Sequence, residues 1–450
     1  MFPECASRPD GAELHRRLVA AVGAAARELA ALEPGRLVSL SVPLPFEVAM
    51  PGPASEGDSR WLCCHDGLRI HGVGQAACFD SDAAGRFGAA CRRWHLLGPA
   101  NPPPLAFFTI PPATEPATPR IWIPRIAVRR GGGFSGITLS AWWDGGSPEA
   151  TARGWFDDAG RLAAGAETPR PAPPLRVLAT EADPDDAAWD QRVRRAAEAV
   201  ADGRLDKVVL ARRLTSLLSR PVDPARITKA LARAHPQCCV FSLPCGRGRV
   251  IAASPELLAV KRGNQLVSNA VAGTARRHGD PGEDAAAAAA LLASVKERRE
   301  HAVVVNAIAS SLTEICHEVE RRPEPHVMPL RFLQHLWTPI TGRLRAGIGL
   351  IDVVTRLHPT PAVLGSPAQA AIDWLRDIGE RRDGLYTGIA GWVDREGDGD
   401  AAVVLRSAYI EDRTAVLWAG AGIMADSDPR AELAETEMKL ASLMEVLNAP

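Results

Sequence analysis

The sequence lacks a long apolar run, a surplus of charge of one sign and an internal repeat. No stretch of its 450 residues approaches the roughly 18 unbroken apolar residues of a membrane-spanning helix. The N-terminal segment MFPECASRPDGAELHRR does not join a basic region to an apolar core, as a secretory signal would. Lys and Arg total 52 against 53 Asp and Glu, which gives a net charge of -1. We therefore expect a cytoplasmic protein whose main partner is neither a nucleic acid nor a membrane.

Two common kinds of site are also missing. The nine cysteines are odd in number and contain no C-x-x-C, so they predict reduced, mostly buried thiols rather than disulfides or a zinc cage. Cys63, Cys64 and His65 are adjacent, but three consecutive side chains on one strand cannot converge on a single ion. Glycines 131–133 lie between strand-like runs with no helix pattern after them, so they predict a hairpin rather than a phosphate loop.

The chain has 46% hydrophobic residues, enough for a large core. A helix is expected at residues 13–32, followed by strands of an antiparallel sheet in RLVSLSVPL, RIWIPRIAVRR and SGITLSAWW. The proline-rich segment 165–174 predicts a linker. Beyond it strands and helices alternate, with helices expected at residues 187–202 and 284–312.

Lys207 begins an otherwise apolar strand pattern, DKVVLARR. Alternation places it on one face with Val209 and Ala211. Two interpretations stay open at this point. The side chain can snorkel at a strand end with its ammonium in water. Alternatively, Lys207 is desolvated, neutral and able to act as a base.

Two carboxylates lie on the apolar stripe of the helix expected at residues 284–312. Glu297 and Glu300 fall in line with Val304 and Ile308 at three- and four-residue intervals. Neighbouring buried carboxylates need a compensating cation, and a hard ion such as Mg²⁺ suits oxygen ligands. The alternative is a rotated helix with both carboxylates in solvent.

The C-terminal segment SDPRAELAETEMKLASLMEVL predicts a helix that Asp428 caps. Glu432 and Glu435 follow, and such acidic residues can simply balance the helix dipole. Lys439 lies four residues after Glu435, where it can form a surface ion pair.

Upstream of this helix, AVLWAG predicts a strand that runs into a tight turn at Gly420 and Gly422, whose amides are able to face an anion. A base, several acids, a metal and anion-binding groups together suit a small anionic substrate.

Six motifs follow one another along the second half of the chain: SPELL (254–258), VAGTARR (271–277), KERREH (296–301), HPTPAV (358–363), AGAGI (419–423) and ELAETEMKL (432–440). They occur in this order in the chorismate-utilising enzymes, and the chain resembles that family over residues 187–447. The family includes isochorismate synthases, salicylate synthases and the large components of anthranilate and aminodeoxychorismate synthases. The resemblance implies an α+β fold like that of anthranilate synthase component I, with two intertwined subdomains of antiparallel sheets flanked by helices. It also implies an N-terminal scaffold half, residues 1–175, and a chorismate-binding catalytic half, residues 176–450.

The lysine in DKVVLAR is absent from the ammonia-using members, so the chain resembles the water-using members. By this resemblance Lys207 is the general base that activates water for attack at ring C2 of chorismate. Glu256 is then the general acid that protonates the departing C4 hydroxyl. Burial would favour the neutral lysine and the protonated glutamate that these roles need.

The same resemblance implies a Mg²⁺ ion on the ring carboxylate of the substrate. Glu300 and Glu435 match its ligands, and Glu297 and Glu432 lie close behind. Other matched positions would hold the two carboxylates of chorismate or line the pocket: Arg406, Lys439, Gly420, Gly422, Thr274, His335 and Tyr386. Taken alone, His335 is more typical of a hydrogen-bonded core histidine.

Ala362 in HPTPAV bears on the product. Isochorismate synthases resemble this sequence there, whereas salicylate-forming members typically have threonine, so we expect isochorismate. One alternative is a salicylate synthase that eliminates pyruvate in the same site, and another is an inactive chorismate-binding scaffold. Trp337 and Leu364 depart from the family pattern by being bulkier. We expect a monomer, with a dimer as the alternative, and siderophore, menaquinone and salicylate synthesis stay open as destinations of the product.

Overall fold

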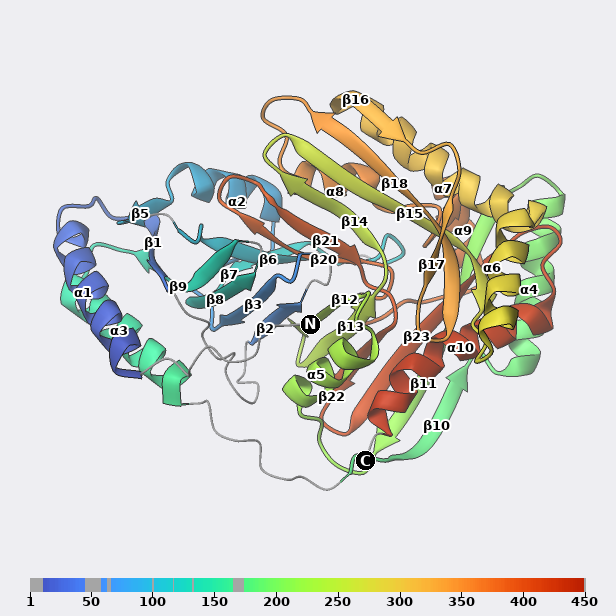
Figure 1. Ribbon diagram of the computed structural model, residues 1–450, viewed down its shortest axis with the longest axis horizontal. Coiled ribbons are helices and arrows are strands. Elements are labelled where there is room, and N and C mark those ends of the chain that lie inside the picture. Colours follow the sequence, from blue (N-terminus) through green and yellow to red (C-terminus); the bar gives the residue numbers. More distant parts are fainter. Residues whose placement is uncertain are drawn as a thin grey trace.

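The computed structural model describes residues 11–44, 58–62, 66–98, 101–115, 117–131, 133–164 and 174–448. Two large sheets form the body of the protein, and helices cover their faces and both ends of the molecule (Figure 1). The helices are α1 (Gly11–Leu29), α2 (Ala83–Arg92), α3 (Pro148–Ala164), α4 (Asp186–Ala201), α5 (Pro224–Ala234), α6 (Pro281–Ala293), α7 (Val295–Thr313), α8 (Leu350–Leu357), α9 (Ala368–Asp377) and α10 (Pro429–Leu447).

The larger sheet has 13 strands. Their order is β10 (Val177–Asp183), β11 (Lys207–Leu218), β23 (Thr414–Ile423), β22 (Ser407–Glu411), β13 (Gly248–Ser254), β12 (Cys239–Cys245), β2 (Ser59–Leu62), β3 (Arg69–Val73), β8 (Ile126–Gly131), β9 (Phe134–Trp143), β1 (Arg36–Pro43) and β5 (His95–Leu97), with β19 (Gly365–Ser366) beside β11. Among the described strands only β1 and β5 pair in parallel.

The second sheet has 10 strands. Their order is β16 (Cys316–Arg321), β18 (Leu333–Leu344), β15 (Gln265–Arg276), β14 (Leu257–Arg262), β21 (Gly399–Val403), β20 (Ile389–Asp394), β6 (Leu105–Ile110), β7 (Arg120–Ile123) and β4 (Ala77–Phe79), with β17 (His326–Pro329) beside β18. Strands from the first 175 residues and from the rest of the chain occur in both sheets. The expectation of intertwined antiparallel sheets in an α+β fold is confirmed, while the boundary at residue 175 stays a prediction.

The chain passes from one sheet to the other at several short connections, and two of them lie in the second half of the chain. One joins β13, which ends at Ser254, to β14, which begins at Leu257. The other joins β21, which ends at Val403, to β22, which begins at Ser407. Glu256 and Arg406 lie in these connections, so the topology brings both residues to the junction between the sheets.

Two helices carry acidic residues towards the same junction. α7 packs on β15 and β18, and α10 packs on β23 and on α4 (Figure 1). Asp428 caps α10 as predicted, because its carboxylate accepts from the amides of Arg430 and Ala431. The described helices include none that is long and apolar enough to cross a membrane.

The prediction of a single helix over residues 284–312 is wrong. The segment forms two helices, α6 and α7, which are divided at Ser294. The Ser294 hydroxyl caps α7, because it accepts from the Glu297 amide at 3.3 Å. The helices expected at residues 13–32 and 187–202 are confirmed as α1 and α4. The glycine hairpin is confirmed as well, since Gly131 of β8 pairs with Phe134 of β9.

The cysteines agree with the expectation of thiols where the structure describes them. Cys78, Cys91, Cys238, Cys239, Cys245 and Cys316 are free, and half of them are buried. The adjacent Cys63, Cys64 and His65 lie outside the described residues, as does most of the expected linker at 165–174.

Candidate active site

A pocket with a volume of about 90 Å³ lies at the junction of the two sheets. Every residue that lines it comes from position 209 or later in the chain. The lining residues are Val209, Pro255, Glu256, Val271, Ala272, Gly273, Thr274, Glu300, His335, Ala362, Val363, Tyr386, Thr387, Leu405, Arg406, Trp418, Ala419, Gly420, Gly422, Glu435 and Lys439. This set includes most of the site residues that the sequence predicts. Of the others, Lys207 pairs with the lining residue Glu300, and Glu297 and Glu432 lie behind the pocket wall.

Lys207 is the first residue of β11 and is only 1% exposed. Its Nζ donates to Glu300 Oε1 at 2.7 Å. The snorkelling interpretation is therefore wrong, because the ammonium points into the protein and not into water. Gly422 of β23 makes this pair possible, since a Cβ at that position would stand 2.5 Å from Glu300 Oε1 and 2.7 Å from Lys207 Cε.

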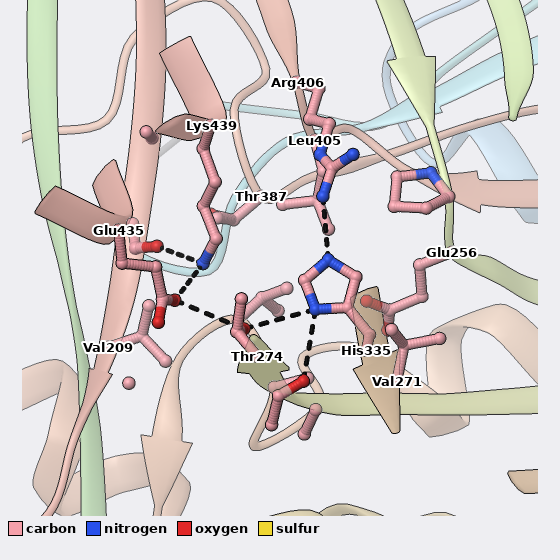
Figure 2. A pocket seen from close by; sticks show the side chains of 18 of the residues that line it. Val209, Glu256, Val271, Thr274, His335, Thr387, Leu405, Arg406, Glu435 and Lys439 are labelled. Atoms are coloured by element: carbon pink, nitrogen blue, oxygen red, sulfur yellow. Dashed lines mark hydrogen bonds and ion pairs between the residues drawn. The ribbon is translucent and has the colours of Figure 1, made fainter. Parts of the chain in front are cut away.

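Glu256 lies in the connection between β13 and β14 and is buried. Its backbone is fixed on both sides, since its amide donates to Ser254 Oγ and its carbonyl accepts from the Val403 amide. The side-chain Oε1 has no hydrogen-bond partner among the described residues. Burial raises the pKa of Glu256 to about 8, although the charge of Lys207 opposes the shift. A protonated carboxyl with a free oxygen thus borders the pocket (Figure 2).

Glu300, the partner of Lys207, belongs to a cluster of four carboxylates with Glu297, Glu432 and Glu435. Glu297 accepts from the Thr274 amide at 2.9 Å, and burial together with the charge of Glu300 raises its pKa. Burial and the charge of Glu435 raise the pKa of Glu432 to about 7. The solvent-exposed alternative for α7 is wrong, because the Glu300 side chain is only 13% exposed.

Lysines partly balance these carboxylates. Lys439 Nζ lies 2.6 Å from Glu435 Oε1, and Lys296 Nζ lies 3.3 Å from Glu432 Oε1. Within the described ranges no three His, Cys, Asp or Glu side chains are arranged as a preformed metal site. The four glutamates nevertheless fit a hard cation such as a divalent metal ion, because the atoms they offer are carboxylate oxygens. Their negative charges also repel one another, and a bound cation would relieve that repulsion.

A chain of hydrogen bonds fixes the far wall of the pocket (Figure 2). Arg406 Nη2 donates to His335 Nε2 at 2.7 Å, which leaves the proton of the neutral ring on Nδ1, 3.2 Å from the Gly273 carbonyl oxygen. Burial and the charges of Arg406 and Lys439 hold the pKa of His335 well below its ordinary value. The histidine is therefore a neutral acceptor that orients the guanidinium at the pocket wall.

Lys439 forms the expected ion pair with Glu435 and a second contact as well. Besides Glu435 it binds the Gly420 carbonyl at 2.7 Å, and both its partners line the pocket. The turn expected at Gly420 and Gly422 is wrong, because both residues belong to β23 and pair with β11. The other neighbour of β23 is β22, which pairs with it only as far as Leu417. On that side Gly420 and Gly422 therefore have no paired strand in the described sheet. The use of these glycine amides for an anion stays a prediction.

The sequence interpretation missed several apolar lining residues, of which Trp418 is the largest. Its ring stacks on Tyr386 with centroids 5.5 Å apart and planes 12° apart. Alternation along AVLWAGAG places Trp418 on the same face of the strand as Gly420 and Gly422, and this signal was available in the sequence.

The side chains of the two departures from the family pattern, Trp337 and Leu364, have partners outside the pocket lining. Trp337 donates to Asn269 Oδ1 at 2.9 Å, and Leu364 packs in the apolar cluster beneath α9. Neither residue lines the pocket. Their bulk therefore does not reshape it directly.

An α+β scaffold with a buried pocket of fixed carboxylates and cations defines an enzyme-like site for a small anionic molecule. The model of the chorismate binding enzyme family matches residues 112–448, so the chain belongs to that family.

Two curated relatives and one solved structure show similarity over long segments. The salicylate biosynthesis isochorismate synthase of Pseudomonas aeruginosa is 39% identical over 58% of this chain and 55% of its own length. The isochorismate synthase EntC of Escherichia coli is 36% identical over 60% of this chain and 70% of its own. The structure of the menaquinone-specific isochorismate synthase MenF from Escherichia coli superposes with a TM-score of 0.78 at 28% identity, covering 96% of this chain and all of that one.

Proposed function

We propose that this protein is an isochorismate synthase, which adds water at C2 of chorismate and releases the C4 hydroxyl. The observation that carries the proposal is the buried Glu256, whose carboxyl keeps its proton near neutral pH and whose Oε1 is free at the pocket wall. The names of the two curated relatives and of the solved structure support the same activity.

In the proposed step two residues exchange protons with the substrate. The Lys207 ammonium, which pairs with Glu300, first releases a proton to solvent, and the neutral amine then takes a proton from water as the water oxygen bonds to C2. The intervening ring double bonds shift, and the bond between C4 and its hydroxyl breaks. Glu256 gives its proton to that hydroxyl, which leaves as water. One water enters and one departs, so substrate and product are isomers.

Two fixed cations account for binding of a dianion. Arg406 is held by His335, and Lys439 is held by Glu435 and the Gly420 carbonyl. We assign these cations to the two carboxylates of chorismate, with Thr274, Tyr386 and Ala362 along the wall.

We assign Glu300 and Glu435 as ligands of Mg²⁺, with Glu297 and Glu432 close behind them. The mutual repulsion of these carboxylates and their oxygen chemistry support the assignment. When bound, the ion supplies positive charge to the ring carboxylate of the substrate. We also assign residues 1–175 as a scaffold, because all lining residues come from the later part of the chain.

The test is to incubate the purified protein with chorismate and Mg²⁺, with and without EDTA, and to separate the products by chromatography. We expect isochorismate only when the metal is available. Salicylate with pyruvate would show the lyase activity instead, and binding without conversion would show an inactive scaffold.

A further inference from the structure

Arg382 is a buried cation behind the pocket wall that the proposed chemistry does not use. It lies between α9 and β20, and its side chain is 1% exposed. Its Nε and Nη2 contact Glu380 Oε1 at 2.9 and 2.8 Å. The other oxygen of Glu380 accepts from the Ala211 amide of β11 at 3.0 Å. The charge of Arg382 is thus compensated inside the protein.

The remaining donors of Arg382 reach three separate segments of the pocket wall. Nη2 donates to the Val209 carbonyl at 2.5 Å, and Nη1 donates to the Val363 carbonyl at 2.6 Å and to Thr387 Oγ1 at 3.2 Å. Val209, Val363 and Thr387 all line the pocket. One planar guanidinium therefore ties β11, the loop before β19 and the turn before β20 to one another.

The turn before β20 needs such support. Leu385 and Thr387 have φ values of 70° and 63°, and a left-handed conformation is strained for a β-branched residue. Such backbone persists only where the surroundings hold it in place. Between them Tyr386 stacks on Trp418, and its hydroxyl lies so close to Gly420 that a Cβ there would stand 2.7 Å away.

We propose that Arg382 is a positioning residue, which holds the strained turn at Thr387 so that Tyr386 stays in the pocket against the substrate. The proposal rests on the proposed function, because its effect is on the binding and turnover of chorismate. Arg382 acts through Tyr386 and has no contact with the substrate of its own.

A double-mutant cycle tests this proposal. The variants Arg382→Gln, Tyr386→Phe and their combination are compared by kcat and KM for chorismate. We expect Arg382→Gln to reduce kcat/KM about tenfold in the wild-type background and less than about twofold in the Tyr386→Phe background, because coupled residues are not additive. Equal losses in the two backgrounds would overturn the proposal, since a general structural role does not depend on the Tyr386 hydroxyl.

Two further variants keep the test decisive. If Arg382→Gln does not fold, Thr387→Val takes its place in the cycle, because it removes only the hydroxyl that Arg382 Nη1 contacts. The same non-additivity with Tyr386→Phe is expected, and additivity again contradicts the proposal. Arg376→Gln, an exposed arginine of α9 that pairs with Asp373, is the matched control and should leave both constants unchanged. Absence of isochorismate from the wild-type protein would instead contradict the proposed function.

Discussion

Lys207 and Glu300 form a buried ion pair, with Nζ 2.7 Å from Oε1, between the first residue of β11 and helix α7, which packs on the other sheet. The pair joins the residue assigned as the base to a residue assigned as a metal ligand. Its formation depends on Gly422, which leaves room for both side chains. The proposed base and metal site are therefore parts of one contiguous cluster.

Lys207→Ala is expected to abolish formation of isochorismate. Loss of a general base costs about 10²- to 10⁴-fold in rate, so kcat should fall at least into that range while chorismate still binds, as measured by calorimetry. Lys261→Ala is the matched control, because Lys261 forms a buried pair with Asp398, 2.6 Å away and outside the pocket. Retained turnover in the Lys207 variant would remove Lys207 from the role of base.

The rate should depend on the protonation of Glu256. Burial raises its pKa to about 8, and the acid role requires the protonated form, so kcat/KM should fall as pH rises through about 8. Glu256→Gln should lower the rate and remove this alkaline limb from the pH profile. The folded protein also holds this proton more tightly than the unfolded chain. Protonated Glu256 therefore stabilises the fold fully at pH values below the pKa of this glutamate in the unfolded chain. This stabilisation is lost as pH rises through about 8. An unchanged alkaline limb in Glu256→Gln would assign that limb to another group.

Glu300→Gln should weaken metal binding. We expect the Mg²⁺ concentration for half-maximal activity, and the metal dissociation constant from calorimetry, to rise about ten- to hundredfold or more. Glu437→Gln changes an exposed carboxylate of α10 and serves as the control. The same metal titration for Glu300→Gln and wild type would exclude Glu300 as a ligand.

A single methyl group at Gly422 should damage the site more than the fold. The new Cβ would press on Lys207 Cε and Glu300 Oε1 and displace both groups. Misplacement of about 1 Å can cost about 10²-fold in rate, and we expect a loss of that size in kcat. Gly279→Ala is the control, because a Cβ there meets nothing within 4 Å. Nearly normal kinetics in Gly422→Ala would show that the Lys207 and Glu300 positions are not critical.

The sequence predicted which face of a helix or strand the candidate site residues occupy better than it predicted where the helices end. Regular spacing placed Glu297 and Glu300 on the inward face of α7, and strand alternation placed Lys207 on the face of Val209. Apolar spacing alone did not show that Ser294 divides the preceding helix, although Ser294 followed three residues later by Glu297 is the sequence pattern of a helix N-cap.

Long-range pairing also decided features that local pattern left open. Gly420 and Gly422 suggest a turn by composition, yet the register with β11 keeps them in a strand. The role of Arg382 was invisible because its acceptors at Val209 and Val363 are backbone carbonyls, which any residue type can provide.

The most direct test of the central claim is to run the reaction in H₂¹⁸O and locate the label in the product by mass spectrometry. The account predicts isochorismate with one ¹⁸O in its C2 hydroxyl, formed by the wild-type protein and not by Lys207→Ala. Isochorismate without the label would contradict addition of water at C2, and no isochorismate in the presence of Mg²⁺ would contradict the proposed function.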